Sequence, residues 1–345
     1  MSMVIYVGLD VHLNSIAAVW GKAKDKPRSM TVTPTEDGFK ALTEAVGTKD
    51  VWGVYEASSC GFEAYDELRA RGWKMSIVAP THVTKSPHAK KRKTDLRDAK
   101  HLWEILMSHG ELGTELAEIW IPSQELQEER EIVRRRLTLS ESSCRVKNGI
   151  LSLLRMHKIK RPETMKTAWS RKHVAWLRGL TKDETLGASV RTVLESHVRE
   201  LDFVEGEIEI VQKAVEALAE TPRYRGAVET MTEVAGVGVL TALTFLVELG
   251  DVRRFDNRRQ VGCYLGLVPA SYESGEADDR KGHITRLGPP RVRKVLNQAA
   301  WHLVRLDPLW RKRYEGIASR GGAKTAIVAI MRKLGIELWQ RAKSA

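Results

Sequence analysis

The sequence predicts an α/β domain with a mixed sheet, followed by a chain that is mainly helical. The sheet is predicted by three β-branched apolar runs at 4–10, 16–21 and 29–33, after which helical and strand-like patterns alternate. The helical part is predicted by apolar residues at helical spacing from residue 123 onward. These patterns favour three segments: 1–112, 113–221 and 222–345.

After the three strands, the first segment continues with two helix–strand pairs. Residues 37–46 have helical spacing and precede a strand-like run at 50–58. Residues 62–72 form a second helix that Gly72 closes, and 74–80 form the last strand. Helices that alternate with strands in this order pack on the faces of one sheet.

A basic stretch follows the last strand. Residues 81–93 are polar, basic and aperiodic, which predicts a loop, and a helix is predicted from Thr94 or Asp95 to about Gly110. The loop ends in four consecutive cations that suit phosphate binding: Lys90, Lys91, Arg92 and Lys93.

The middle segment contains a heptad seam with one polar position, His197. Its members alternate spacings of four and three residues: Val190, Leu194, His197, Leu201, Val204, Ile208, Val211, Val215 and Leu218. The seam fits an amphipathic helix in the core of one chain, but its length favours a coiled coil that joins protomers.

The last segment carries a glycine turn and many cations. Gly236 and Gly238 fit the hairpin of a helix-hairpin-helix, which offers backbone N–H groups to a phosphate, or equally a tight turn between core helices. Residues 280–294 hold six basic residues and no acid. Those expected to face nucleic acid are Arg280, Lys281, Arg286, Arg291 and Arg293.

Composition limits the class of protein. The 345 residues are 42% hydrophobic and 29% charged, which is typical of a globular chain, and the net charge of +12 favours a polyanionic partner, nucleic acid before membrane. Three scattered cysteines form neither a disulfide framework nor a metal-ligand cluster. Without an apolar stretch of membrane length or a secretory signal, we expect a cytoplasmic, nucleoid-associated protein.

Four acids stand where metal ligands are expected. Asp10 and Glu56 end predicted strands, and Asp95 and Asp98 share one face at the start of a helix. Converging carboxylates repel one another, and a hard cation such as Mg²⁺ (or Mn²⁺) relieves the repulsion. Each acid also fits ordinary capping, but the combination beside a cationic loop favours a metal site at a phosphodiester.

These motifs resemble those of the insertion-sequence-110 family of DEDD transposases. The similar stretches are "GLDVH" at 8–12, "YEAS" at 55–58, "KTDLRDA" at 93–99, "GLVP" at 266–269 and "YESG" at 272–275. The resemblance implies an RNase H/RuvC-like first domain with Asp10, Glu56, Asp95 and Asp98 as an acidic tetrad. It also implies that Ser274 is a nucleophile that forms a covalent phosphoserine with DNA. "ESGE" lacks the second glycine of the family's common serine-glycine-glycine form.

The resemblance further implies partners and an assembly. A structured bridge RNA would pair with double-stranded donor and target DNA, and a homodimer or homotetramer would combine the acidic domain of one protomer with the serine domain of another. His283 is the histidine nearest to Ser274 in sequence, and no role follows for it.

Three other functions remain open. One is a Holliday-junction-type nuclease that uses water and a metal ion. A second is an ATPase of the actin and sugar-kinase type, whose first strand also ends in a phosphate turn. The third is a non-enzymatic nucleic-acid scaffold.

Overall fold

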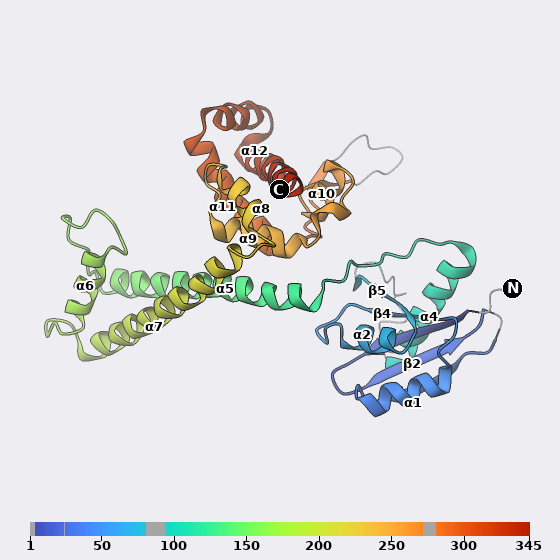
Figure 1. Cartoon of the computed structure of the whole chain (residues 1–345). Helices are drawn as coiled ribbons and strands as arrows, with labels where there is room; N and C mark the ends of the chain where they lie inside the picture. The colour runs from blue at the N-terminus through green and yellow to red at the C-terminus, as the bar shows by residue number, and fades with distance from the viewer. Residues whose placement is uncertain (1–3, 24, 81–93, 272–280) are drawn as a thin grey trace. The chain divides into compact units, whose positions relative to one another are not determined.

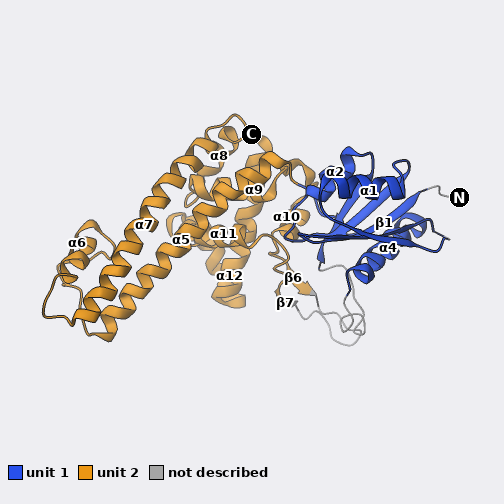
Figure 2. Ribbon diagram, turned by 90° about the horizontal axis from the view of Figure 1, so that it is seen from below, with its two compact units in different colours: residues 1–121 blue, residues 122–345 orange. Residues whose placement is uncertain are grey.

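The computed structural model describes residues 4–23, 25–80, 94–271 and 281–345, with the side chains of Ser271 and Lys281 left out. The chain divides into two compact units, Met1–Ile121 and Pro122–Ala345 (Figures 1 and 2). Each unit has its own elements and its own buried core. The predicted division into three segments stays a prediction.

Unit 1 is built on a five-stranded mixed sheet in the order β3-β2-β1-β4-β5. β1 pairs antiparallel with β2, which pairs antiparallel with β3, whereas β4 is parallel to both β1 and β5. The strands are β1 (Ile5–Val11), β2 (Ile16–Gly21), β3 (Arg28–Val32), β4 (Val51–Glu56) and β5 (Lys74–Val78). The structure therefore confirms the mixed sheet, and its first three strands pair antiparallel in chain order.

Helices cover both faces of this sheet. α1 (Glu36–Val46) and α2 (Glu63–Ala70) bury Phe39 and Leu68 on one face, where the strands contribute side chains such as Leu9. α4 (Asp95–Leu112) packs on the other face through Leu102 and Leu106. Because both faces are covered, β1 and β4 are apolar along most of their length, as the sequence shows.

The stretch after α4 stays with the sheet. The Ala79 amide donates to the Ala117 carbonyl at 3.3 Å, and the Ile119 amide donates to the Ile77 carbonyl at 2.8 Å. These bonds hold the chain along the end of β5, so unit 1 extends to Ile121.

Unit 2 is mainly helical within its described residues. Its long helices are α5 (Gln124–Met156), α7 (Ala188–Ala219), α11 (Pro290–Leu306) and α12 (Pro308–Ser344). Shorter elements are α6 (Arg171–Leu180), α8 (Arg225–Thr232), α9 (Val239–Leu249), η2 (Val252–Arg254), α10 (Arg258–Tyr264) and the two-stranded sheet of β6 (Pro269–Ser271) and β7 (Lys281–Ile284).

The heptad seam lies on α7, and α5 of the same chain packs against it (Figure 1). Leu194, Val198 and Leu201 are buried with Val146 and Ile150 of α5. An intrachain helix therefore covers part of the seam, and the expected contact of the seam with a second protomer stays a prediction.

The polar position of the seam also has an intrachain neighbour. A Cβ atom at Gly149 of α5 would lie 3.2 Å from Cε1 of His197, so the glycine leaves room for the imidazole ring. His197 is therefore accommodated without separating α5 from α7. Within the described residues, no helix is both long and apolar enough to span a membrane.

Candidate active site

Two of the nominated acids lie side by side at the ends of parallel strands. Leu9 of β1 is opposite Tyr55 of β4, so Asp10 and Glu56 each occupy the next position along their strands. Side chains alternate along a strand, and Tyr6 and Val54 face the α4 side of the sheet. Asp10 and Glu56 follow them at even spacing and therefore face α4 as well.

A glycine lets α4 approach this end of the sheet. A Cβ atom at Gly8 would lie 2.1 Å from the Ala99 carbonyl oxygen and 2.2 Å from the Trp103 amide nitrogen. No other residue type fits without displacing backbone, because both neighbours are main-chain atoms. The close approach brings the first turn of α4, with Asp95 and Asp98, toward the end of β1.

Three side chains meet at this point: Asp10, His12 and Asp95. The His12 Nε2 atom lies 3.2 Å from Asp10 Oδ2 and 3.7 Å from Asp95 Oδ1. One donor atom from each residue falls within 4.8 Å of the others, a spacing that could hold a metal ion. Glu56 and Asp98, both described, are not members of this group.

The surroundings of the Asp10 carboxyl group disfavour its ionised form. Burial raises the pKa of Asp10, the nearby Asp98 and Asp95 carboxylates raise it further, and His12 acts in the opposite direction. The ionised form of Asp10 is therefore disfavoured until a cation approaches. This is the electrostatic setting expected of a metal ligand in its metal-free state.

His12 was missed in the sequence because one histidine two residues after an aspartate carries no periodic signal. It lies in the turn between β1 and β2, where its amide donates to the Ser15 carbonyl at 2.9 Å. The turn directs the imidazole back toward Asp10, so the only hint in the sequence was the end of the "GLDVH" motif.

Comparison with known proteins gives two family matches. Residues 7–159 match a transposase family model of the DEDD IS110 type, and residues 228–315 match a model described as the transposase IS116/IS110/IS902 family. The first match spans all four nominated acids, and the second spans the glycine turn and Ser274.

Relatives that match the chain over most of their length are also transposases or gene-inverting proteins by name. The protein y4rJ of Sinorhizobium fredii (strain NBRC 101917 / NGR234) is 31% identical over 83% of this chain and 76% of the relative. The chain belongs to the IS110 family of transposases. The transposase for insertion sequence element IS1533 of Leptospira borgpetersenii is 24% identical over 99% of this chain and 96% of its own. The pilin gene-inverting protein of Moraxella bovis is 23% identical over 95% and 92%.

Several nominated residues of this transposase lie outside the described residues. They are Lys90, Lys91, Arg92, Lys93, Ser274 and Arg280. Lys281 is described by its backbone in β7, and His283 of the same strand is exposed. The roles nominated for these residues stay predictions, and none is nominated for His283.

The two glycines of the hairpin differ in their surroundings. Gly236 has a φ of +85°, and a Cβ atom there would lie 2.7 Å from Cβ of His302 and 3.0 Å from the Ala299 carbonyl oxygen. A glycine is therefore required at position 236 for packing against α11. Gly238 is the exposed N-cap of α9, with open space where a Cβ would be. Of the two, Gly238 has the better geometry for approaching a phosphate.

The arginines before and within α11 also differ in their surroundings. The Arg293 guanidinium donates to the carbonyl oxygens of Leu265 at 3.2 Å, Gly288 at 2.6 Å and Arg286 at 3.2 Å. Burial lowers the pKa of Arg293, and its hydrogen bonds fix the loop before α11. Arg286 and Arg291 are exposed and better placed to reach a polyanion.

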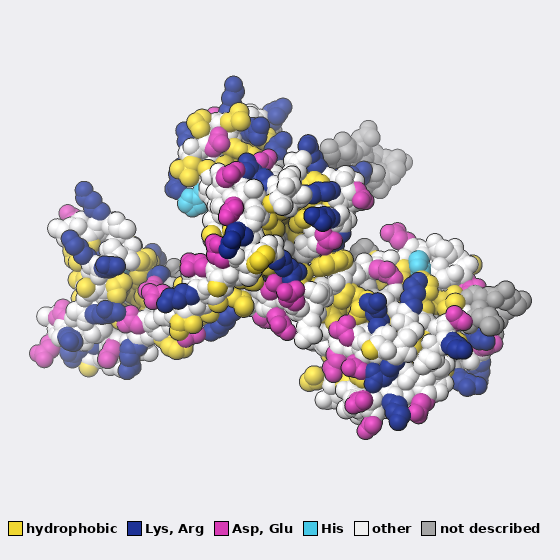
Figure 3. Space-filling view, in the orientation of Figure 1, with side chains coloured by type: hydrophobic (Ala, Val, Ile, Leu, Met, Phe, Trp, Pro, Cys, Tyr) yellow, Lys and Arg dark blue, Asp and Glu magenta, His cyan; other side chains and the backbone are white. Residues whose placement is uncertain are grey.

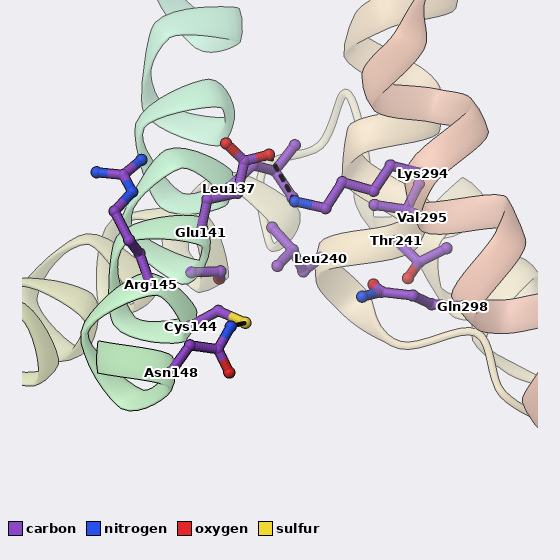
Figure 4. A pocket seen from close by; sticks show the side chains of 11 residues that line it. Leu137, Glu141, Cys144, Arg145, Asn148, Leu240, Thr241, Lys294, Val295 and Gln298 are labelled. Carbon is purple, nitrogen blue, oxygen red and sulfur yellow. Dashed lines mark hydrogen bonds and ion pairs between the residues drawn. The ribbon is translucent and has the colours of Figure 1, made fainter. Parts of the chain in front are cut away.

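A cleft of about 500 Å³ lies within unit 2 between α5, α9 and α11 (Figure 4). Lys294 of α11 reaches across it and donates to Glu141 of α5 at 2.5 Å. This bond lowers the pKa of Glu141, so the two charges compensate each other. Arg145 of α5 also lines the cleft, and its charge lowers the pKa of Glu141 further.

Charge on the molecular surface is mixed. On the face in Figure 3, lysines and arginines are interspersed with acids on both units. The net charge of +12 is therefore not gathered into one basic patch on this face.

Proposed function

We propose that this transposase cleaves and rejoins DNA strands through a covalent phosphoserine on Ser274, with a divalent cation, Mg²⁺ or Mn²⁺, held by Asp10, Glu56, Asp95 and Asp98. One observation carries the proposal. In a chain of this family, the end of β1 and the start of α4 bring Asp10 and Asp95 within metal-binding distance of each other.

The residues present fit a hard divalent cation. Carboxylate oxygens are the ligands that such cations prefer. Burial, together with the nearby Asp98 and Asp95 carboxylates, raises the pKa of Asp10, and a bound cation would offset this cost. When bound, the cation would supply Lewis-acid polarisation of the scissile phosphate. Asp10 and Asp95 would hold it from two elements that Gly8 fixes against each other.

The chemistry of the proposed step is a transesterification. The Ser274 oxygen forms a bond to phosphorus as the bond from phosphorus to a sugar oxygen breaks. The serine proton is lost and the leaving sugar oxygen gains one, so charge and atoms balance. Because one phosphoester replaces another, rejoining by a sugar hydroxyl requires no nucleotide triphosphate.

The proposed partners are donor and target double-stranded DNA, a structured bridge RNA, and further copies of this chain in a homodimer or homotetramer. The positive charge of +12 is compatible with two nucleic acids bound at once. Exposed Arg286 and Arg291, and the open N-terminus of α9 at Gly238, are the described residues proposed to contact phosphates.

Trapping a covalent adduct tests the serine. End-labelled DNA, Mg²⁺ and any required RNA are mixed with the protein, and denaturing gels separate protein-linked DNA. We expect an adduct with the wild type and with Ser271→Ala, and none with Ser274→Ala. An adduct that persists in Ser274→Ala, or strand cleavage by the wild type without any adduct, would show that water or another residue attacks instead.

The same assay tests the acids. Asp10→Asn should lower the rate of adduct formation roughly 100-fold or more, since the variant keeps the shape of the side chain but removes a ligand charge. Unchanged rates in this variant would exclude a metal site at the end of β1.

Guidance by RNA needs a separate experiment. RNA that co-purifies with the protein from its native host is sequenced, then supplied with Mg²⁺ and DNA substrates whose paired segments are altered. Recombination should follow complementarity to the RNA. Recombination at an unaltered rate after ribonuclease treatment would exclude guidance.

A further inference from the structure

We propose that His12 is a nitrogen ligand of the metal ion held by Asp10 and Asp95, and that the site consequently favours Mn²⁺ over Mg²⁺. The inference rests on the metal site of the proposed function. It adds a ligand outside the acidic tetrad and a preference between the two cations.

The first argument is distance. An octahedral ion with ligands at about 2.1 Å places neighbouring ligand atoms about 3 Å apart and opposite ones about 4.2 Å apart. His12 Nε2 lies 3.2 Å from Asp10 Oδ2 and 3.7 Å from Asp95 Oδ1, and donor atoms of all three residues fall within 4.8 Å. The three atoms can therefore surround one ion after shifts of less than about 1 Å.

The second argument is the backbone that carries the imidazole. Val11 pairs with Ile16 at the end of the β1–β2 hairpin, and the His12 amide donates to the Ser15 carbonyl at 2.9 Å. The Cα atom of His12 is thus fixed one residue beyond the strand that carries Asp10. Its side chain is 44% exposed, which leaves access for an ion and its remaining waters.

The chemical consequence follows from ligand type. Mg²⁺ selects oxygen ligands and releases water reluctantly, whereas imidazole binds Fe²⁺, Ni²⁺, Cu²⁺ and Zn²⁺ well. Mn²⁺ is the weakest binder of that first-row series, but as a transition metal it accepts imidazole more readily than Mg²⁺ does. A site of two carboxylates and one imidazole therefore gains more from Mn²⁺ than from Mg²⁺. A site made of the acidic tetrad without His12 would lack this preference.

Mn²⁺ added as its chloride to the metal-free, full-length protein is the probe. Pulsed electron paramagnetic resonance detects ¹⁴N nuclei bound directly to Mn²⁺. We expect a ¹⁴N modulation in the wild type and in His101→Asn, a matched histidine variant on α4, and its loss in His12→Asn. Calorimetric titration should show Mn²⁺ affinity falling roughly 10-fold or more in His12→Asn, with Mg²⁺ affinity changed less than about threefold.

The outcomes separate the two proposals. Mn²⁺ that binds the wild type with a dependence on Asp10 but without ¹⁴N modulation would overturn the role of His12 and leave the acidic site standing. A modulation that survives in His12→Asn would also overturn it. Failure of the wild type to bind either cation at a site that Asp10→Asn removes would overturn the metal site itself. The absence of a ¹⁴N modulation in the wild type would overturn the role of His12 whatever the stability of the His12→Asn variant.

Discussion

At the scale of single residues, the candidate active site depends on the absence of a side chain at Gly8. Gly8 allows the backbone of α4 to lie against β1, with the Ala99 carbonyl oxygen and the Trp103 amide nitrogen where a Cβ would be. The acids do not attract one another, so packing at Gly8 must hold them together. In the "GLDVH" motif, the glycine therefore has as direct a physical role as the aspartate.

Gly8→Ala is expected to destabilise unit 1 by about 3 kcal/mol or more, at the upper end of overpacking costs, because backbone on two sides must move. It should also weaken divalent-cation binding, since α4 carries Asp95. Urea denaturation and cation titration measure the two effects. Gly206→Ala is the control, because open space surrounds Gly206 in α7 and alanine there should be neutral or slightly stabilising.

The setting of Asp10 predicts a pH effect in protein freed of divalent cations. Burial and the neighbouring acids raise the pKa of Asp10 in the folded state, so folding stability falls as pH rises from the ordinary value of 3.8 through the raised folded value. Asp10→Asn removes this cost. The variant should therefore unfold at a higher temperature than the wild type at pH 7, with the difference disappearing below about pH 3.8. A variant less stable than the wild type at pH 7 would contradict the argument.

At the scale of elements, a buried ion pair joins α5 to α9. The Arg134 guanidinium donates to both carboxylate oxygens of Glu248, at 2.8 and 3.0 Å, and the Glu248 side chain is only 7% exposed. Arg130 donates to the Val247 carbonyl at 2.7 Å, near the C-terminal end of α9. Two arginines one turn apart thus neutralise a buried acid and the carbonyls at a helix end.

Removing one partner of this pair should cost far more than removing an exposed pair. Glu248→Gln is expected to lower the free energy of unfolding by about 3 kcal/mol, because Arg134 loses its buried counter-charge and keeps only the exposed Glu131, at 3.5 Å. A double-mutant cycle should give a large coupling energy for Arg134 and Glu248. The pair Arg178–Asp202 has the same 2.8 Å distance but is largely exposed, and should couple by less than about 1 kcal/mol. Equal coupling in the two pairs would show that burial is not the deciding factor.

Elements with a strong local pattern were predictable, and their partners were not. The apolar runs of β1 to β3 and the helix that begins at Asp95 were read from periodicity, which depends only on nearby residues. Four members of the seam on α7 are buried: Leu194, Leu201, Val204 and Val215. That α5 packs on this seam could not be read from the sequence, because a heptad pattern records that a face is covered and not what covers it. The expected contact with a second protomer stays a prediction.

The same limit applies to the candidate site. Asp10, Glu56 and Asp95 could be nominated because strand ends and helix starts are visible in the sequence. His12 could not, since its approach to Asp10 and Asp95 depends on the turn after β1 and on the docking of α4, both of which are tertiary features.

At the scale of the whole molecule, the chain is two units with separate cores. The buried clusters of unit 1 lie around the five-stranded sheet, and those residues all belong to the first 121 positions. Unit 2 buries its own residues, among them Leu334 of α12, which is fully buried like Leu68 of α2. Cores that share no residues are expected to melt as separate cooperative units.

Calorimetry of the full chain should therefore show two unfolding transitions. Leu68→Ala should lower the midpoint of one transition by about 10 °C, since a buried leucine deletion costs about 3 kcal/mol in a unit of this size. Leu334→Ala should lower the other, by a smaller interval because unit 2 is larger. Divalent cations should raise only the transition that Leu68→Ala lowers, because Asp10, His12 and Asp95 all belong to unit 1. A single transition that both substitutions lower would mean that the two units fold as one.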